Sequence, residues 1–303
     1  MSDNKSFMAK MEEAILRHTK PGYMDSKEEV DNFLRNKPDQ KPPKGIFKMS
    51  DSQLYTFGNE NAKNTIIFMH GGAYVNEINY QHLLYCRKLS RKLDAYVIAP
   101  VYPLAPRHNA METYGMMTEI YKTLNHENLI LMGDSAGGGF VLSFAQYLKT
   151  VGLPQPSRII AFSPWVDISM SNLPYDREND PILGDVGLRE IGKSWAGDLD
   201  TKDYRVSPLY GDLEGQAQTL IFAGTSEIFY KDIKLYVEKL KMSNVDVKFI
   251  EGEGLFHIYP LFPSSEAKKA FKEINGQNFS KFDETCKHTN PIDSKYFKKK
   301  KYE

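Results

Sequence analysis

Short apolar runs alternate along the chain with segments in which apolar residues recur at helical spacing. One run, 129–132, is apolar throughout and is followed by glycines and then by 140–148, a segment typical of a helix. Such runs predict buried strands, which we expect at 65–69, 95–99, 129–132, 158–162, 219–223 and 246–250. Helices are expected to alternate with them, at 81–92, 112–124, 140–148, 188–196, 230–242 and from about 265.

Strands that are nearly continuously apolar are typical of a parallel sheet covered on both faces. The pattern therefore predicts an α/β fold with a mostly parallel central sheet flanked by helices. Sites in such sheets lie at the carboxyl ends of the strands. The residues that follow each apolar run are thus the first candidates for catalytic or binding roles.

Two parts of the chain stand outside this alternation. Residues 1–45 are charged and helix-prone, and an insertion at about 168–215 carries three prolines, several glycines and one predicted helix. We expect the N-terminal arm and the insertion to form a helical cap over the main domain, 46–275. The remaining residues, 276–303, form a polar, Lys-rich tail.

The glycine-rich corner after the run 129–132 holds the first candidate for chemistry. It reads Gly133-Asp134-Ser135-Ala136-Gly137, and it stands between a predicted strand and a predicted helix. A serine at such a sharp corner is a candidate nucleophile elbow, with flanking glycines that let the backbone turn tightly. An ordinary βα turn is the alternative. A phosphate loop is disfavoured because no Lys-Ser or Lys-Thr pair follows.

A serine nucleophile needs a histidine to take its proton, and the histidine needs a carboxylate to orient it. In the strand–elbow–helix arrangement the chain order is serine, acid, histidine. His257 follows the strand 246–250, whereas the other late histidine, His288, lies in the polar tail. Glu227 stands just past the strand 219–223 and is the first candidate for the acid. Asp232 and Asp167 remain alternatives.

Acyl transfer also needs N–H donors aimed at the developing oxyanion. His70-Gly71-Gly72-Ala73 follows the first predicted strand, as the His-Gly-Gly-Gly type of loop does. Its glycines would let backbone N–H groups approach a substrate, and the amide of Ala136 would complete the donor set. His70 is expected to be a structural hydrogen-bonding residue, because no second metal ligand stands near it at a suitable spacing.

Charge and cysteine content narrow the function classes. Among 303 residues, Lys plus Arg and Asp plus Glu both number 39, so no global field points to nucleic acid or an anionic membrane. The first twenty residues lack an apolar signal core, and no run approaches the ~18 apolar residues of a membrane span. The two cysteines, Cys86 and Cys286, suggest neither a disulfide framework nor a zinc site. We expect a cytoplasmic protein without cofactor or metal.

The run Lys298 to Lys301 near the end of the chain has two interpretations. It is expected to be a solvated tail, and a hook for membrane or nucleic acid is the alternative. Neither stable membrane insertion nor nucleic-acid binding is expected. The oligomeric state is left open, and a homo-oligomer is compatible with the sequence.

Taken together, the motifs resemble the hormone-sensitive-lipase-like family of α/β-hydrolases, which are mostly carboxylesterases. The resemblance runs from about Ile66 to Pro260. It is carried by His70-Gly71-Gly72-Ala73, Tyr102-Pro103-Leu104-Ala105-Pro106, Gly133-Asp134-Ser135-Ala136-Gly137-Gly138, Ser163-Pro164-Trp165-Val166-Asp167, the segment around Glu227 and the loop with His257.

The resemblance implies an α/β-hydrolase fold in which the N-terminal arm and the insertion build the cap. It implies Ser135 as nucleophile, His257 as base and Glu227 as acid, with the amides of Gly72, Ala73 and Ala136 as the oxyanion hole. The implied activity is hydrolysis of carboxylic esters with short to medium acyl chains through an acyl-serine intermediate. Alternatives are an amidase or deacetylase on the same triad, and a catalytically silent ligand-binding homologue.

Three positions depart from the pattern of the family. Ala73 replaces the third glycine of the loop, and Glu227 stands where the acid is usually aspartate. Arg107 follows the Tyr-x-Leu-Ala-Pro segment where an acidic residue is usual. The contacts that this segment usually makes in the family are therefore not expected to carry over unchanged.

Overall fold

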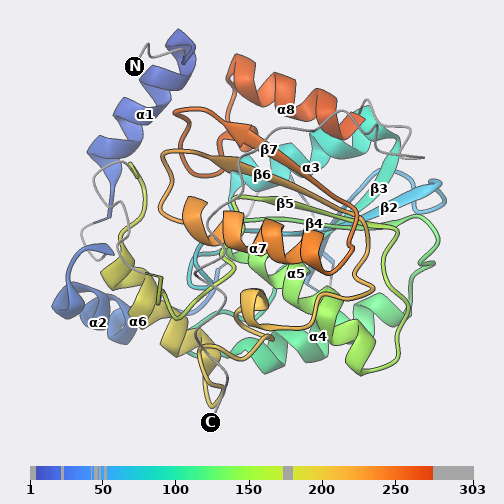
Figure 1. The fold of residues 1–303 in the computed structure, drawn as a ribbon, viewed down its shortest axis with the longest axis horizontal. Helices are drawn as coiled ribbons and strands as arrows, with labels where there is room; N and C mark the ends of the chain where they lie inside the picture. Colours follow the sequence, from blue (N-terminus) through green and yellow to red (C-terminus); the bar gives the residue numbers. More distant parts are fainter. Residues whose placement is uncertain are drawn as a thin grey trace.

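The computed structural model describes residues 5–21, 24–41, 43, 47, 49–50, 53–172 and 180–275. Its centre is a seven-stranded sheet in the order β1-β3-β2-β4-β5-β6-β7 (Figure 1). The strands are β1 Leu54–Phe57, β2 Asn64–Met69, β3 Ala95–Pro100, β4 Leu129–Asp134, β5 Arg158–Phe162, β6 Thr219–Gly224 and β7 Val247–Gly252. Strands β2 to β7 are parallel, which confirms the predicted α/β fold with a mostly parallel sheet.

Strand β1 was not predicted. It pairs antiparallel with β3 at the edge of the sheet, with Tyr55 opposite Ala99. Only Tyr55 of its four residues is buried, and the segment Leu54–Phe57 is short and interrupted by Thr56. The hydroxyl of Tyr55 donates a hydrogen bond to the carbonyl of Pro43, which ties the end of the N-terminal arm to the sheet edge.

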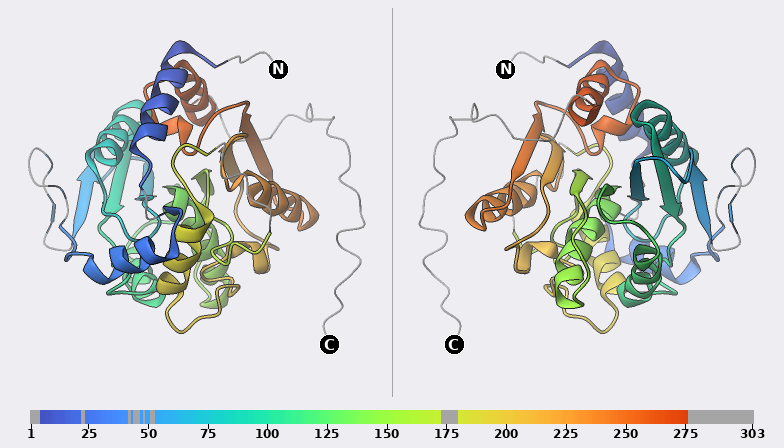
Figure 2. Two further views of the ribbon diagram at one scale, coloured as in Figure 1. Left: turned by 90° about the vertical axis from the view of Figure 1, so that its left-hand side faces the viewer. Right: turned by 90° about the vertical axis from the view of Figure 1, so that its right-hand side faces the viewer.

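Helices cover both faces of the sheet because alternate strand residues point to opposite sides. Ile67 and Met69 belong to a core shared with α4 (Ala110–Lys122), α5 (Ser135–Thr150) and α7 (Tyr230–Met242). Ile66 and Phe68 belong to a second core shared with α3 (Tyr80–Leu93) and α8 (Ser265–Asn275). Figures 1 and 2 show the resulting three layers, with the sheet in the middle.

Three further helices lie outside these layers: α1 (Phe7–Thr19), α2 (Lys27–Asn36) and α6 (Asp185–Ala196). Helix α2 of the arm packs against α6 of the insertion, as the left view of Figure 2 shows. The arm and the insertion approach each other closely just before these two helices begin. There, a Cβ on Gly184 would lie 2.5 Å from the carbonyl oxygen of Met24.

Helix α1 takes a different course. It lies beside α8, and the backbone N–H and hydroxyl of Ser6 donate hydrogen bonds of 2.7 and 2.8 Å to the carboxylate of Glu266. The two helices of the arm therefore contact separate parts of the molecule, with α2 against the insertion and α1 against the last helix of the described chain.

The Lys-rich tail, 276–303, lies outside the described residues, and so do His288, Cys286 and Lys298 to Lys301. Within the described ranges, no helix combines the length and apolar character needed to cross a membrane.

Candidate active site

The candidate nucleophile sits at the corner between β4 and α5. Strand β4 ends at Asp134 and α5 begins at Ser135, whose φ of +52° is unusual for a residue with a side chain. A Cβ on Gly137 would lie 2.0 Å from the carbonyl oxygen of Met69, and one on Gly133 would lie 2.5 Å from that of Gly137. Glycine is therefore required at both positions for the corner to pack against β2.

His257 and Glu227 converge on this serine from two neighbouring loops. The ring Nε2 of His257 lies 2.8 Å from Ser135 Oγ, and its Nδ1 lies 3.6 Å from Glu227 Oε2. The second distance is longer than a hydrogen bond. In the described part of the chain, His257 Nδ1 and Glu227 Oε1 are both buried without a hydrogen-bond partner.

The carboxylate of Glu227 is held by the loops around it. Its Oε2 accepts a 2.6 Å hydrogen bond from the hydroxyl of Ser163 and a 3.3 Å bond from the N–H of Gly224. The same hydroxyl accepts the N–H of Ile258 at 2.8 Å. Ser163 therefore links the loop of Glu227 to the loop of His257.

Burial shifts the acid–base behaviour of this pair. It raises the pKa of Glu227, against the opposing effects of His257 and Ser163. Burial alone would lower the pKa of His257, but the Glu227 carboxylate outweighs it, with smaller contributions from Asp180 and Asp134. The net result is a His257 pKa above its usual value, because nearby negative charge favours the imidazolium.

The two alternative acids are used elsewhere. Asp232 accepts a 2.8 Å hydrogen bond from Asn172 Nδ2. Asp167 accepts hydrogen bonds from three side chains, those of Ser169, Ser171 and Tyr210, at 2.5–3.2 Å. Of the three carboxylates considered from the sequence, Glu227 is the one that the structure brings to His257.

The loop after β2 runs directly beside Ser135. The N–H of Gly71 donates a 3.0 Å hydrogen bond to Asp134 Oδ1, and a Cβ on Gly71 would lie 3.0 Å from Ser135 Cβ. Gly72 and Ala73 have φ values of +115° and +53°, so Ala73 keeps the left-handed backbone that glycine would favour. Ala136 lies in the first turn of α5, where backbone N–H groups have no acceptor within the helix.

His70 anchors this loop. Its Nδ1 contacts the carbonyl oxygen of Gly71 at 2.6 Å, and its ring stacks on Tyr102 with centroids 4.4 Å apart. Complete burial, reinforced by the nearby His82, lowers the pKa of His70 to about 3, so the ring is neutral at physiological pH. These contacts agree with the structural role expected for His70.

A cavity of about 320 Å³ opens over Ser135 and His257. Gly72 and Ala73 form part of its floor. Its other walls combine apolar residues from the arm, the insertion and the loop after His257 with polar residues from the segment 76–82, namely Pro21, Met24, Ile182, Leu183, Ile258, Leu261, Asn76, Glu77, Asn79, Gln81 and His82.

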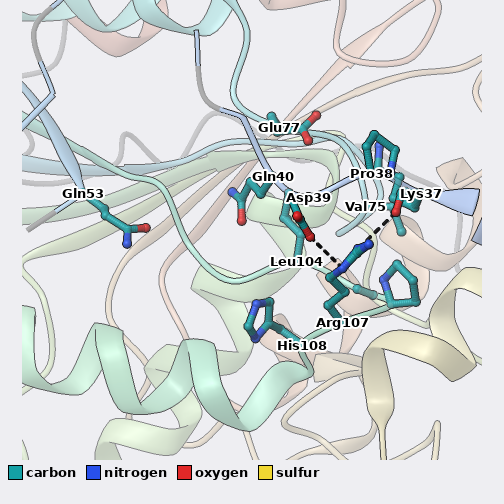
Figure 3. A pocket seen from close by; sticks show the side chains of 12 residues that line it. Lys37, Pro38, Asp39, Gln40, Gln53, Val75, Glu77, Leu104, Arg107 and His108 are labelled. Atoms are coloured by element: carbon teal, nitrogen blue, oxygen red, sulfur yellow. Dashed lines mark hydrogen bonds and ion pairs between the residues drawn. The ribbon is translucent and has the colours of Figure 1, made fainter. Parts of the chain in front are cut away.

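A second cavity, of about 280 Å³, shares Glu77 with the first but contains neither Ser135 nor His257 (Figure 3). Arg107 lies on its wall, with Nε 2.9 Å from Asp39 Oδ1 and Nη1 donating to the carbonyl of Lys37 at 3.0 Å. The basic residue that departs from the family pattern thus binds the N-terminal arm.

Three polar residues near the site were not singled out as functional from the sequence. His82 Nε2 lies 3.4 Å from Asp134 Oδ2, and Asp180 accepts the N–H of Ile228, the residue after Glu227, at 2.9 Å. Ser163 was visible only as part of the Ser-Pro-Trp motif. No local sequence signal marks His82 or Asp180. Among the described residues, no group of three or more His, Cys, Asp or Glu side chains is arranged to hold a metal ion.

Comparisons with known proteins agree with this geometry. Residues 66–261 match the family model described as alpha/beta hydrolase fold. An esterase from Acinetobacter venetianus is 30% identical over 224 residues, which cover 71% of this chain and 74% of the relative. A triacylglycerol lipase from Mycobacterium tuberculosis is 31% identical over 165 residues, 53% of this chain and 34% of that protein.

Solved structures show the same fold. The crystal structure of a hormone-sensitive lipase from a metagenome library superposes with a TM-score of 0.74 at 22% identity, covering 90% of this chain and 98% of that one. At this level of identity the similarity concerns the fold.

Proposed function

Because the chain belongs to the α/β-hydrolase fold family, we propose that it is a serine hydrolase that cleaves carboxylic esters through an acyl-serine intermediate. The observation that carries the proposal is the 2.8 Å distance between Ser135 Oγ and His257 Nε2 at a strand-to-helix corner. This distance lets the imidazole accept the serine proton directly. The relatives named as esterase and lipase support the same reaction class.

In the proposed acylation step, Ser135 Oγ attacks the ester carbonyl carbon while His257 Nε2 takes the hydroxyl proton. The carbonyl oxygen becomes an oxyanion beside the backbone N–H groups of Gly72, Ala73 and Ala136. The imidazolium then protonates the leaving alcohol as the carbon–oxygen bond breaks. In deacylation, water attacks the acyl-serine with His257 again as base, and the acid product leaves.

Glu227 is the proposed acid of this triad. A carboxylate beside Nδ1 selects the tautomer that leaves Nε2 free to accept a proton, and it stabilises the imidazolium once formed. The 3.6 Å separation fits this role because catalytic hydrogen bonds in unliganded sites are often long and tighten when substrate is bound. Ser163 and Gly224 hold the carboxylate toward the ring.

The cavity suggests the size of the substrate. A volume of about 320 Å³ is near the lower end of the ~300–1,000 Å³ range of ligand sites, and Met24, Leu183 and Leu261 give it apolar walls. We infer short to medium acyl chains. Since its walls come from the arm and from the insertion, we also infer that 1–45 and about 168–215 form a cap over the catalytic domain, 46–275.

Initial rates on p-nitrophenyl esters from acetate to decanoate test the proposal. Ser135→Ala is expected to reduce kcat by about 10⁴-fold or more, and Glu227→Gln by about a hundredfold or more. The matched variant Asp232→Asn removes a buried carboxylate of α7 and is expected to keep kcat within about twofold. Equal losses in Glu227→Gln and Asp232→Asn would contradict Glu227 as the acid.

Covalent labelling by a fluorophosphonate separates the alternatives. Labelling of Ser135 without ester turnover would point to amide or acetyl-amide substrates on the same triad. If the folded protein showed neither labelling nor turnover, a catalytically silent ligand-binding protein would replace the proposed hydrolase.

A further inference from the structure

Asp180 is a buried carboxylate that the catalytic steps above do not use. It is 1% exposed and lies on the insertion, shortly before α6. Its Oδ1 accepts the N–H groups of Ile182 at 2.8 Å and Leu183 at 2.9 Å, and its Oδ2 accepts the N–H of Ile228 at 2.9 Å. One side chain therefore holds two separate stretches of backbone.

These two stretches of backbone belong to different parts of the site. Ile182 and Leu183 form part of the cavity wall over Ser135, and the chain continues through Gly184 into α6. Ile228 directly follows Glu227 on the loop after β6. A carboxylate that accepts three backbone N–H groups from both sides fixes the distance between the cavity wall and the candidate acid.

We propose that Asp180 is a positioning residue that fixes the Ile182–Leu183 wall relative to the Glu227 loop, and so determines both the acyl-chain preference and the orientation of the acid. The inference rests on the proposed esterase function. It predicts that one substitution alters the size selectivity of the cavity and the acid–base behaviour of His257 together.

The charge of Asp180 supports the second effect. The negative groups that act on His257 are Glu227, Asp180 and Asp134, and together they raise its pKa against the effect of burial. Asp180 also raises the pKa of Glu227, because two buried negative charges repel. Removing the charge at Asp180 should therefore make the His257 imidazolium less stable.

The test uses Asp180→Asn and Asp180→Ser in the full chain, with Asp185→Asn as control. Asparagine cannot accept with its NH₂ group, so one of the two backbone stretches loses its partner. Serine is short and can still accept from the residues that follow it in a turn, but it loses the reach to Ile228. Asp185 is a buried aspartate in the first turn of α6, and it interacts with Arg189.

We expect kcat/KM on p-nitrophenyl butyrate to fall about tenfold in Asp180→Asn, the size expected for losing a hydrogen bond to a charged group. The acyl-chain optimum should shift, and the acidic limb of the kcat/KM–pH profile should move to lower pH. Asp180→Ser, which loses the link to Ile228, should show both changes, and Asp185→Asn should show neither.

Two results would overturn the inference. One is an Asp180→Asn protein whose chain-length profile and pH limb both match the parent. The other is an equal change in Asp185→Asn, which would indicate a general loosening of the cap. If Asp180→Asn does not fold, by circular dichroism and thermal melting, Asp180→Ser decides the question by the same two readouts. An inactive, unlabelled parent protein would instead contradict the proposed function itself.

Discussion

The hydroxyl of Ser163 lies 2.6 Å from Glu227 Oε2 and donates its proton to that carboxylate. Since a hydroxyl has one proton, its remaining bond, 2.8 Å to the N–H of Ile258, is accepted by a lone pair. Ser163 is fully buried and has φ +47°, and Ile258 has φ +52°. The hydroxyl of Ser163 thus joins Ser163 to Ile258, two residues with uncommon backbone conformations. Through the same hydroxyl, Glu227 is connected to the residue that follows His257.

We expect Ser163→Ala to lower kcat about tenfold with a smaller change in KM. The substitution leaves the N–H of Ile258 without its acceptor and removes a donor from Glu227, and each such loss in a buried site costs about 1–3 kcal/mol. Steady-state kinetics on p-nitrophenyl butyrate provide the measurement.

Ser143→Ala is the matched control for this change. The buried hydroxyl of Ser143, on α5, donates to the carbonyl of Phe140 and accepts from the hydroxyl of Tyr114. Its loss should reduce the free energy of unfolding by about 1 kcal/mol and leave kcat unchanged. Similar kcat values in the two variants would show that Ser163 does not orient the acid.

The pH dependence should report His257. The base must be neutral to take the serine proton, so kcat/KM should rise with pH through the pKa of His257, at a value above the usual ~6.5. Glu227→Gln removes the main source of that elevation and should move the limb to lower pH while reducing kcat. A limb that stays in place in Glu227→Gln would contradict the pairing of the two residues.

Gly137→Ala should prevent stable folding, whereas Gly115→Ala should stabilise the protein. A Cβ on Gly137 would lie 2.0 Å from a backbone oxygen of β2, while a Cβ on Gly115, in the exposed face of α4, meets nothing within 4 Å. Alanine in place of glycine inside a helix gains about 0.5–1 kcal/mol. Urea unfolding gives both values, and a Gly137→Ala protein as stable as the parent would contradict the close packing of the corner on β2.

Glu12→Gln should stabilise the protein at pH 8 and have no effect at pH 3. Glu12 is 7% exposed, and within the described residues neither carboxylate oxygen has a hydrogen-bond partner. Burial, with the nearby Glu266, raises the pKa of Glu12, so its ionisation costs stability once the pH rises above about 4.5.

Glu13→Gln should do the opposite. Burial disfavours the charge of Glu13, but its bonds to Lys5 and Arg17 outweigh burial and lower its pKa. Its stabilising effect is present above the unfolded-state pKa and is lost as the pH falls below it. Melting temperatures at pH 3 and pH 8 test both variants, and a change of the same sign in both at pH 8 would reject this account of α1.

Most of the parallel strands could be predicted because they are buried on both faces, whereas β7 has a single buried residue. Strands such as β4 and β5 consist of apolar residues almost throughout, and their boundaries were placed within two residues. Strand β1 was not predicted because its four residues are a short segment, interrupted by a threonine, of which only Tyr55 is buried. Its place comes from pairing with β3, which a local sequence window does not contain.

The candidate site also contains residues that could be predicted from the sequence and residues that could not. Ser135, His257 and Glu227 could be proposed because each stands in the corner or loop that follows a predicted strand. Ser163 also follows a predicted strand directly, but its bonds to Glu227 and to the N–H of Ile258 are formed only in the folded chain. The bond from Asp180 to the distant N–H of Ile228 likewise has no local sequence signal. A backbone donor is available at nearly every position, so no residue type identifies it.

The close approach of Gly184 to Met24 has a consequence for how the protein is made. During synthesis the segment with Met24 emerges before the insertion, so the backbone that it packs against does not exist until Gly184 has been added. At ~5–20 residues per second, the interval is on the order of 10 s. During this time the apolar side of α2, including Val30, has no insertion to cover it. The wall of the cavity that comes from the arm is therefore translated well before the part of the insertion against which it packs.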